Sequence, residues 1–207
     1  LQQDASSKLN FAPQKTMRIA QQLYEGVNIK GQGTVGLITY LRTDSTRISV
    51  EADAAAKEYI KEAYGAEFVG AGTVAKKDDK KVQDAHEAIR PTYMTNSPAS
   101  IKDELSRDQF RLYQLIWNRF MASRMAPAKY ENTSVKIAAG DYRFNASASK
   151  IAFDGFLSVY NINNEKSEGN VMLKSIDEDT KLTLNDLEPK QHFTQPPAHY
   201  TEASLVK

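Results

Sequence analysis

The chain has 207 residues, enough for one large domain or two small ones with packed cores, and its 41% hydrophobic and 26% charged residues are ordinary for a globular protein. A formal net charge of +1 excludes a basic field over the whole molecule, so a nucleic acid would have to be held by a local patch. The lack of cysteine excludes disulfides, thiolate zinc sites and cysteine catalysis. No apolar run approaches the roughly 20 residues that span a bilayer, so we expect no membrane partner and a cytoplasmic location.

Two short helices are predicted at the start of the chain. Leu1, Ala5 and Leu9 recur at the four-residue spacing of one helix face. Pro13 suits the first turn of a second helix, and Gly26 suits its end. The pair resembles a helix-turn-helix, which keeps open a non-catalytic DNA-binding module, although such pairs are more often packing units.

The next stretch has the residues of greatest chemical interest. Gly31 and Gly33 indicate a turn, and the apolar run that follows ends at Tyr40, where the chain leaves the core. A tyrosine hydroxyl is a weak nucleophile unless positive charge lies nearby, and Arg42 and Arg47 follow within a few residues. These residue types fit a nucleophile that faces a phosphodiester. The alternative is an amphipathic, half-buried tyrosine beside solvated arginines.

A helix and a loop are predicted after this stretch. Ser49 is a good N-cap, the alanine-rich sequence that follows has strong helix propensity, and Gly65 indicates the end. Residues 68–81 have the composition of an exposed loop. Asp78 and Asp79 in that loop lie among lysines, so we interpret them as solvated charge and predict no metal site.

A second polar motif runs from Asp84 to Thr92. Asp84 and Glu87 have the spacing of a capping box, which would put His86 at a helix N-terminus with Arg90 one turn further on. The His-Glu pair also begins like the zinc motif His-Glu-x-x-His, but Arg90 occupies the position of the second histidine, so a zinc site is excluded. From the pattern alone, a His-Glu pair in a capped turn is more often structural than catalytic.

A long helix is predicted to follow Ser106. Ser106 and Gln109 form a capping box, and Pro127 lies beyond the end. Its aromatic residues share one face, which favours a core role over base stacking. These residues are Phe110, Tyr113, Trp117 and Phe120, with Met121 beside them. On the other face, Arg111, Arg119 and Arg124 are candidates for contacts with DNA.

The hydrophobic period changes to two after Lys129, which predicts a hairpin that turns at Gly140. Further strands are predicted at Phe156–Tyr160 and Leu182–Leu184. The fold class is therefore α+β: a mostly helical domain over 1–127 with helix-turn-helix-like packing, a small antiparallel β unit over 128–200, and the start of a helix over 201–207. Because the chain ends as that helix begins, we expect it to be a piece of a longer protein.

Three stretches resemble the type IA DNA topoisomerases, and specifically the bacterial topoisomerase I branch. They are Gly36–Ser49, Ala85–Thr92 and Gln191–Lys207. The resemblance implies that Tyr40 attacks a DNA backbone phosphate and becomes joined to the 5′ phosphate, and that Arg42 and His86 assist at that phosphate. It suggests phosphate or DNA contacts for Thr43, Ser45, Arg47 and Arg90. One departure is Ala198-His199, where the family has Pro-Arg, so no binding role is assigned to His199.

The resemblance also implies what lies outside the chain. In the family an acidic cluster in a separate amino-terminal domain binds Mg²⁺, and the β unit is half of an arch whose other strands come earlier in the sequence. We therefore expect no cofactor in this piece, single-stranded DNA and the amino-terminal metal-binding domain as partners, and no relaxation of supercoils by the piece alone. Two other classes remain as alternatives: the helix-turn-helix module, and a structural or protein-interaction domain, which the near-neutral charge would suit.

Overall fold

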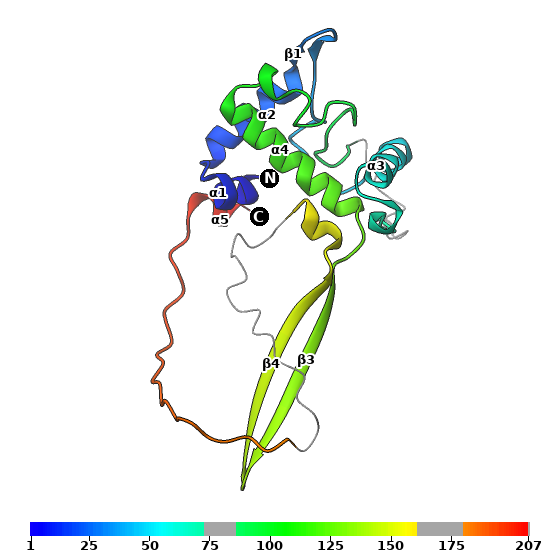
Figure 1. The fold of residues 1–207 in the computed structure, drawn as a ribbon. Helices are drawn as coiled ribbons and strands as arrows, with labels where there is room; N and C mark the ends of the chain where they lie inside the picture. The colour runs from blue at the N-terminus through cyan, green and yellow to red at the C-terminus, as the bar shows by residue number, and fades with distance from the viewer. Residues whose placement is uncertain (73–85, 161–179, 207) are drawn as a thin grey trace, which may run out of the picture. The chain divides into compact units, whose positions relative to one another are not determined.

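The computed structural model describes residues 1–72, 86–160 and 180–206, which form two compact units. The first unit contains residues 1–72, 86–128, 154–160 and 201–206, and the second contains residues 129–153 and 180–200. Helices gather in the first unit and a long hairpin forms the second, which confirms the α+β class (Figure 1). The hairpin begins close to the predicted boundary at residue 127. The prediction did not include residues 154–160 in the helical unit, to which they return together with residues 201–206.

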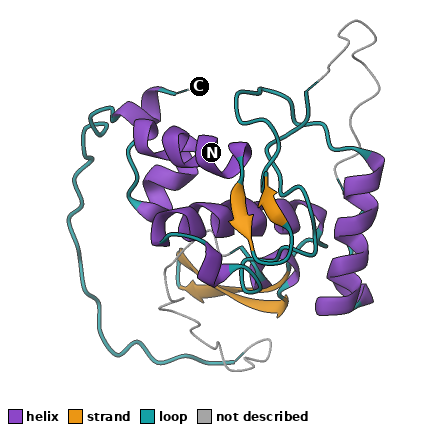
Figure 2. Ribbon diagram, turned by 90° about the horizontal axis from the view of Figure 1, so that it is seen from above, coloured by secondary structure: helices purple, strands orange, loops and turns teal. Residues whose placement is uncertain are grey.

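The first unit is built around one long helix. Its helices are α1 (Gln2–Leu9), α2 (Pro13–Glu25), α3 (Val50–Ala63), α4 (Arg107–Arg124) and α5 (Glu202–Leu205). Helix α4 packs against α1, α2 and α3, while α5 packs against α1. Helix α3 lies at the opposite end of the unit from α1 and α5, as both ribbon views show (Figures 1 and 2).

The helices begin and end where their capping residues require. The side chain of Ser49 accepts a hydrogen bond from the Ala52 amide at the start of α3. Ser106 and Gln109 form the predicted capping box of α4. Gly26 follows α2 with a φ of 126°, which a residue with a side chain rarely adopts. The predicted helices that correspond to α1, α2, α3, α4 and α5 are confirmed.

The aromatic face of α4 forms the centre of the core. Tyr113, Trp117, Phe120 and Met121 are buried as predicted, while Phe110 is only partly buried. Helix α2 contributes its buried face of Ile19, Ala20 and Leu23 to the same core. Each fully buried large apolar side chain stabilises the fold by about 1.5–3 kcal/mol. The α1–α2 pair is thus a packing unit of this core.

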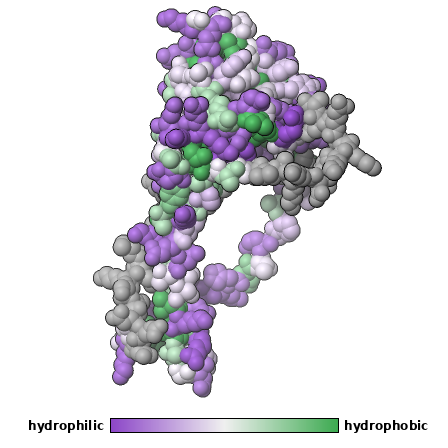
Figure 3. Space-filling view, turned by 90° about the vertical axis from the view of Figure 1, so that its right-hand side faces the viewer, coloured by the Kyte–Doolittle hydropathy of each residue, from purple (hydrophilic) through white to green (hydrophobic). Residues whose placement is uncertain are grey.

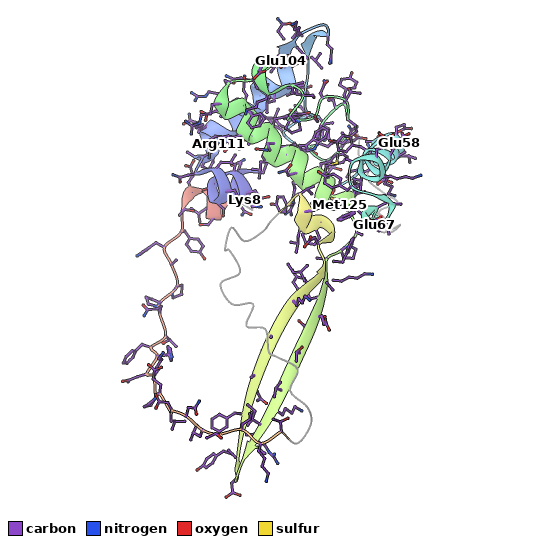
Figure 4. All side chains as sticks on the ribbon, in the orientation of Figure 1. Lys8, Glu58, Glu67, Glu104, Arg111 and Met125 are labelled. Atoms are coloured by element: carbon purple, nitrogen blue, oxygen red, sulfur yellow. The ribbon has the colours of Figure 1, made fainter. Side chains whose placement is uncertain are left out.

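The three arginines of α4 differ in exposure: Arg124 is buried, Arg111 is partly buried and Arg119 is exposed, so the predicted DNA contact is wrong for Arg124 and stays a prediction for the other two. Arg124 is buried and its Nη1 lies 2.9 Å from Oδ1 of Asp53 on α3. Arg111 donates a hydrogen bond of 3.1 Å to the Leu9 carbonyl, on the side of α4 that faces α1 (Figure 4). Arg119 lies over the ring of Tyr160 and donates to its hydroxyl. All three cations hold elements of the unit together.

A short hairpin that the sequence patterns did not predict leads to the tyrosine segment. Its strands are β1 (Val27–Ile29) and β2 (Gly33–Val35), paired antiparallel. Gly31 and Gly33 have φ values of 80° and 75°, so the predicted glycine turn is present between the strands. The hairpin brings the chain back to the end of α2.

The predicted strand at Phe156–Tyr160 is wrong. Its first three residues belong to a 3-10 turn (Gly155–Ser158) whose first residue has a φ of 49°, and the last two contain no strand. A Cβ at Gly155 would lie 2.7 Å from the Pro127 carbonyl oxygen, and the Phe156 amide donates to the Ala126 carbonyl at 3.0 Å. This close approach to the end of α4 needs a turn, which apolar periodicity could not reveal.

The second unit contains the predicted hairpin, formed by β3 (Lys129–Ala139) and β4 (Tyr142–Phe153). Most of its side chains are exposed on both faces. Residues 180–200 contain neither helix nor strand, so the predicted strand at Leu182–Leu184 is wrong. The predicted polar loop at 161–170 lies outside the described residues. On the face of the molecule that Figure 3 shows, the helical unit is mostly hydrophilic, with small separate hydrophobic areas.

Candidate active site

The segment before Tyr40 is held on both sides by backbone hydrogen bonds. The Leu37 amide donates to the Leu23 carbonyl at the end of α2, at 2.8 Å, and the Thr92 amide donates to the Leu37 carbonyl at 3.1 Å. Ile38 forms an antiparallel bridge with Pro91. Leu37 and Ile38 are fully buried, so the tyrosine follows directly after a segment that is fixed in the core.

Tyr40 lies at the surface between two other rings. Its side chain is 41% exposed. The ring of Tyr24, from the last turn of α2, makes an edge contact with it at a centroid distance of 5.5 Å. The ring of His86 lies at 5.8 Å with a tilt of 36°. Two segments that are far apart in the sequence therefore place an imidazole beside an accessible phenol.

The loop after Tyr40 presents the predicted cations to solvent. Leu41 is buried and anchors the loop, whereas Arg42 and Arg47 are exposed. The Arg47 carbonyl accepts a hydrogen bond of 2.8 Å from the Ala88 amide, and its guanidinium has a long contact of 3.5 Å with the His86 carbonyl. The loop is thus joined to the His86 segment.

The hydroxyl groups of this loop stabilise its conformation. The Thr43 hydroxyl oxygen accepts from the Ser45 amide at 3.0 Å, and the Ser45 hydroxyl oxygen accepts from the Arg47 amide at 3.2 Å. These are the local turns that serine and threonine favour in loops. Both side chains are half-buried, and they lie on the same loop as the exposed Arg42 and Arg47.

The His86 segment is not the helical turn that the spacing predicted. Residues 86–90 contain no helix, and Asp84, the first residue of the predicted capping box, lies outside the described residues. The segment is not helical because it pairs with the tyrosine segment: the Thr39 amide donates to the Arg90 carbonyl at 3.0 Å, and the Thr39 hydroxyl donates to the Ala88 carbonyl at 2.7 Å. Tertiary pairing has replaced the local helical preference.

Among the predicted site residues, Arg90 has a charge that is already paired. Its Nε and Nη2 donate to Oε2 of Glu87 at 2.9 and 2.6 Å, and its Nη1 donates to the Pro91 carbonyl at 3.0 Å. The side chains of Arg90 and Glu87 are 14% and 19% exposed. In contrast, Arg42 forms no ion pair with any of the described residues.

Sequence reasoning missed two residues of this arrangement. Tyr24 was given no role by the sequence patterns, but its ring is 39% exposed and contacts Tyr40. Thr39 was counted as part of the apolar run, but its hydroxyl joins the two motifs. Its position immediately before Tyr40 was the one available signal, since a hydroxyl within an apolar run is unusual.

The described residues contain neither a metal-binding group of side chains nor a membrane-spanning helix. Among residues 1–72, 86–160 and 180–206, no three His, Asp or Glu side chains lie together in a group that could hold a metal ion. The carboxylate nearest in sequence to His86, that of Glu87, is paired with Arg90. The described helices include none that is long and apolar enough to cross a bilayer.

Comparison with known proteins identifies the family. The sequence profile of the DNA topoisomerase family matches residues 1–207. The solved structure of full-length topoisomerase I from Thermotoga maritima is similar, with 44% sequence identity and a TM-score of 0.67. This chain belongs to the type IA DNA topoisomerases. The matched region covers 78% of this topoisomerase chain and 26% of the Thermotoga chain, so the chain spans about a quarter of the length of that relative.

Proposed function

We propose that this chain provides the tyrosine nucleophile of a type IA topoisomerase, which cleaves one DNA strand transiently, passes a strand through the break and reseals it. Relaxation of negative supercoils would result. The observation that supports this most directly is the exposed Tyr40 ring beside His86, at the end of a segment fixed in the core. Family membership favours this function over the helix-turn-helix and protein-interaction alternatives.

The reaction follows from the chemistry of a phenol and a phosphodiester. The Tyr40 hydroxyl oxygen attacks a backbone phosphorus, and its proton leaves. A phosphotyrosine bond to the 5′ phosphate forms as the bond to the 3′ oxygen breaks, and that oxygen takes up a proton. One phosphodiester replaces another, so the reverse attack by the 3′ hydroxyl reseals the strand and no ATP is needed.

The surrounding side chains have distinct proposed roles. Arg42 and His86 stabilise the negative charge that increases on the phosphate during attack, a role commonly worth about 3–4 kcal/mol for each well-placed donor. Thr43, Ser45 and Arg47 bind neighbouring phosphates of a single strand. Their location on one loop after Tyr40 supports this assignment. Arg90 would contribute less positive charge to phosphate binding, because Glu87 neutralises its guanidinium.

The magnesium ion of the family is proposed to bind elsewhere in the parent enzyme. The described residues do not fit such a site, because they contain no suitable group of carboxylates. We therefore propose an amino-terminal metal-binding domain as the partner of this chain. It follows that the chain alone binds single-stranded DNA weakly and does not relax supercoiled plasmid; relaxation by the purified 207-residue chain would contradict this limit.

The function is tested by trapping the covalent intermediate. The topoisomerase that carries this chain is incubated with a labelled single-stranded oligonucleotide and quenched with denaturant, and the protein-linked label is measured. Tyr40→Phe should abolish the adduct, since it removes one oxygen and retains the ring. Tyr24→Phe is the matched control, because it makes the same change on the adjacent ring and should leave the adduct largely intact. Equal adduct from the wild type and Tyr40→Phe would overturn the proposal.

DNA binding by the chain separates the remaining alternatives. Binding of a single-stranded oligonucleotide is measured by fluorescence anisotropy at two salt concentrations. The proposal predicts weak binding that falls further as salt rises, because phosphate contacts release counterions. A preference for a duplex of particular sequence would support the helix-turn-helix module, and the absence of salt-sensitive binding would support a protein-interaction domain.

A further inference from the structure

An ion pair that is largely shielded from solvent joins Glu87 and Arg90 in the segment that carries His86. Glu87 Oε2 accepts two hydrogen bonds from the Arg90 guanidinium, at 2.9 and 2.6 Å, and the third bond of that guanidinium goes to the Pro91 carbonyl. The side chains of Arg90 and Glu87 are 14% and 19% exposed, whereas those of the surface pair Lys15–Asp108 are 36% and 41% exposed. A pair with such geometry and shielding holds its two residues in one conformation.

The same segment is joined to the tyrosine segment by one threonine. The Arg90 amide donates to the Thr39 hydroxyl oxygen at 2.9 Å, that hydroxyl donates to the Ala88 carbonyl, and the Thr39 amide donates to the Arg90 carbonyl. Thr39 directly precedes Tyr40, and Glu87 directly follows His86. The hydrogen bonds between the segments join Thr39 to Ala88 and Arg90, two and four residues after His86, and so fix the relative positions of the two segments.

We propose that Glu87 and Arg90 are positioning residues, whose ion pair sets the location of His86 beside Tyr40, and that the Arg90 charge serves Glu87 instead of a DNA phosphate. This inference rests on the proposed function and deepens it by assigning the Glu87–Arg90 pair a role. It differs from the role that the family resemblance suggested for Arg90. Misplacement of a reacting group by about 1 Å can lower a rate by about a hundredfold.

Two single variants separate positioning from phosphate binding. For a positioning pair, Glu87→Gln and Arg90→Gln both lower the rate of adduct formation at saturating single-stranded DNA, by about ten- to a hundredfold. Arg90→Gln then leaves the salt dependence of DNA affinity unchanged. For a phosphate ligand, Arg90→Gln instead reduces the slope of log affinity against log salt by about 0.7. Glu87→Gln, which releases the arginine, then strengthens binding without slowing cleavage.

The double variant tests whether the two residues act as a unit. If they do, Glu87→Gln combined with Arg90→Gln slows adduct formation no more than the more damaging single change. Asp108→Asn is the matched control: it makes the same carboxylate-to-amide change in the Lys15–Asp108 pair at the start of α4 and should leave the rate unchanged. Thermal unfolding of every variant shows whether a slow rate reflects loss of fold.

A structural measurement tests the inference without activity. In the NMR spectrum of the 207-residue chain, a cross-peak between the Tyr40 and His86 rings is expected, and Glu87→Gln should weaken it while Asp108→Asn does not. Retention of that cross-peak together with wild-type cleavage in Glu87→Gln overturns the inference and leaves the proposed function standing. Failure of the wild-type enzyme to form any adduct overturns the proposed function, and the cross-peak then decides the positioning role alone.

Discussion

The buried ion pair between α3 and α4 provides the sharpest test of the fold that supports the site. Arg124 is 4% exposed, and its Nη1 lies 2.9 Å from Asp53 Oδ1. Asp53 also binds Lys57 through its other oxygen at 2.6 Å. Burial alone would raise the pKa of Asp53, but hydrogen bonds from Lys57 and Arg124 outweigh it and lower the pKa. Asp53→Asn keeps the size of the side chain and removes the charge that Arg124 needs.

The expected loss follows from the environment of each group. Removal of one partner from a fully buried ion pair costs about 3–5 kcal/mol, because the other charge stays buried. The Asp53 side chain is 27% exposed and asparagine still offers an oxygen, so water and the amide compensate in part. We therefore expect a loss of about 2–3 kcal/mol for Asp53→Asn. Lys57→Gln removes only the more exposed Lys57–Asp53 ion pair on the surface of α3 and should lower the free energy of unfolding by about 0.3–0.5 kcal/mol.

The assay uses the single tryptophan of the chain. Trp117 is buried on α4 and its ring contacts Tyr59 of α3 at 5.4 Å, so its fluorescence reports on the interface that the ion pair closes. Urea unfolding followed at this residue should give the larger loss for Asp53→Asn, and its melting temperature should fall by about 5–10 °C. Equal midpoints for Asp53→Asn and Lys57→Gln would refute the argument that the buried cation depends on Asp53.

Three further outcomes are expected. The pKa of Asp53 is lower in the folded state than in the unfolded state, so its contribution to stability is complete above about pH 4 and is lost as the pH falls through the folded pKa. The free energies of unfolding of wild type and Asp53→Asn should therefore converge as the pH falls, and a constant difference would contradict this. Tyr113→Phe leaves a buried carbonyl without its 2.6 Å donor and should cost about 1–2 kcal/mol in urea unfolding, whereas no loss would show that the bond is replaced. Gly36→Ala would place a Cβ 2.7 Å from the Tyr24 carbonyl oxygen, so the segment must shift and adduct formation at Tyr40 should fall by about tenfold or more; an unchanged rate would show that this approach is not needed.

Local signals in the sequence were sufficient for the elements that depend on local structure. The capping box of Ser106 and Gln109 marked the start of α4, and the glycine at position 140 marked the turn of the long hairpin. The prediction of a strand at Phe156–Tyr160 failed because these residues form a turn. Their apolar side chains still pack into the core of the helical unit, and Tyr160 is buried there. A short apolar run has the same pattern in either conformation.

The site shows the same division between local and tertiary information. The exposure of Tyr40 and of Arg42 follows from the change to polar sequence after the apolar run. The non-helical form of the His86 segment does not, because it arises from pairing with Thr39 almost fifty residues earlier in the chain. Likewise, the contact of Tyr24 with Tyr40 depends on the path of the β1–β2 hairpin, which no local pattern specified.

The proposed function depends most on which oxygen becomes bonded to DNA. The chain contains 10 tyrosines, and Tyr24 and Tyr40 are exposed neighbours, so the choice between these two rings is a real one. The trapped adduct is digested with nuclease and protease, and the peptide that carries the nucleotide phosphate is sequenced by mass spectrometry. We expect the modification on Tyr40 alone. A modification on Tyr24, or on any residue other than Tyr40, would contradict the central claim.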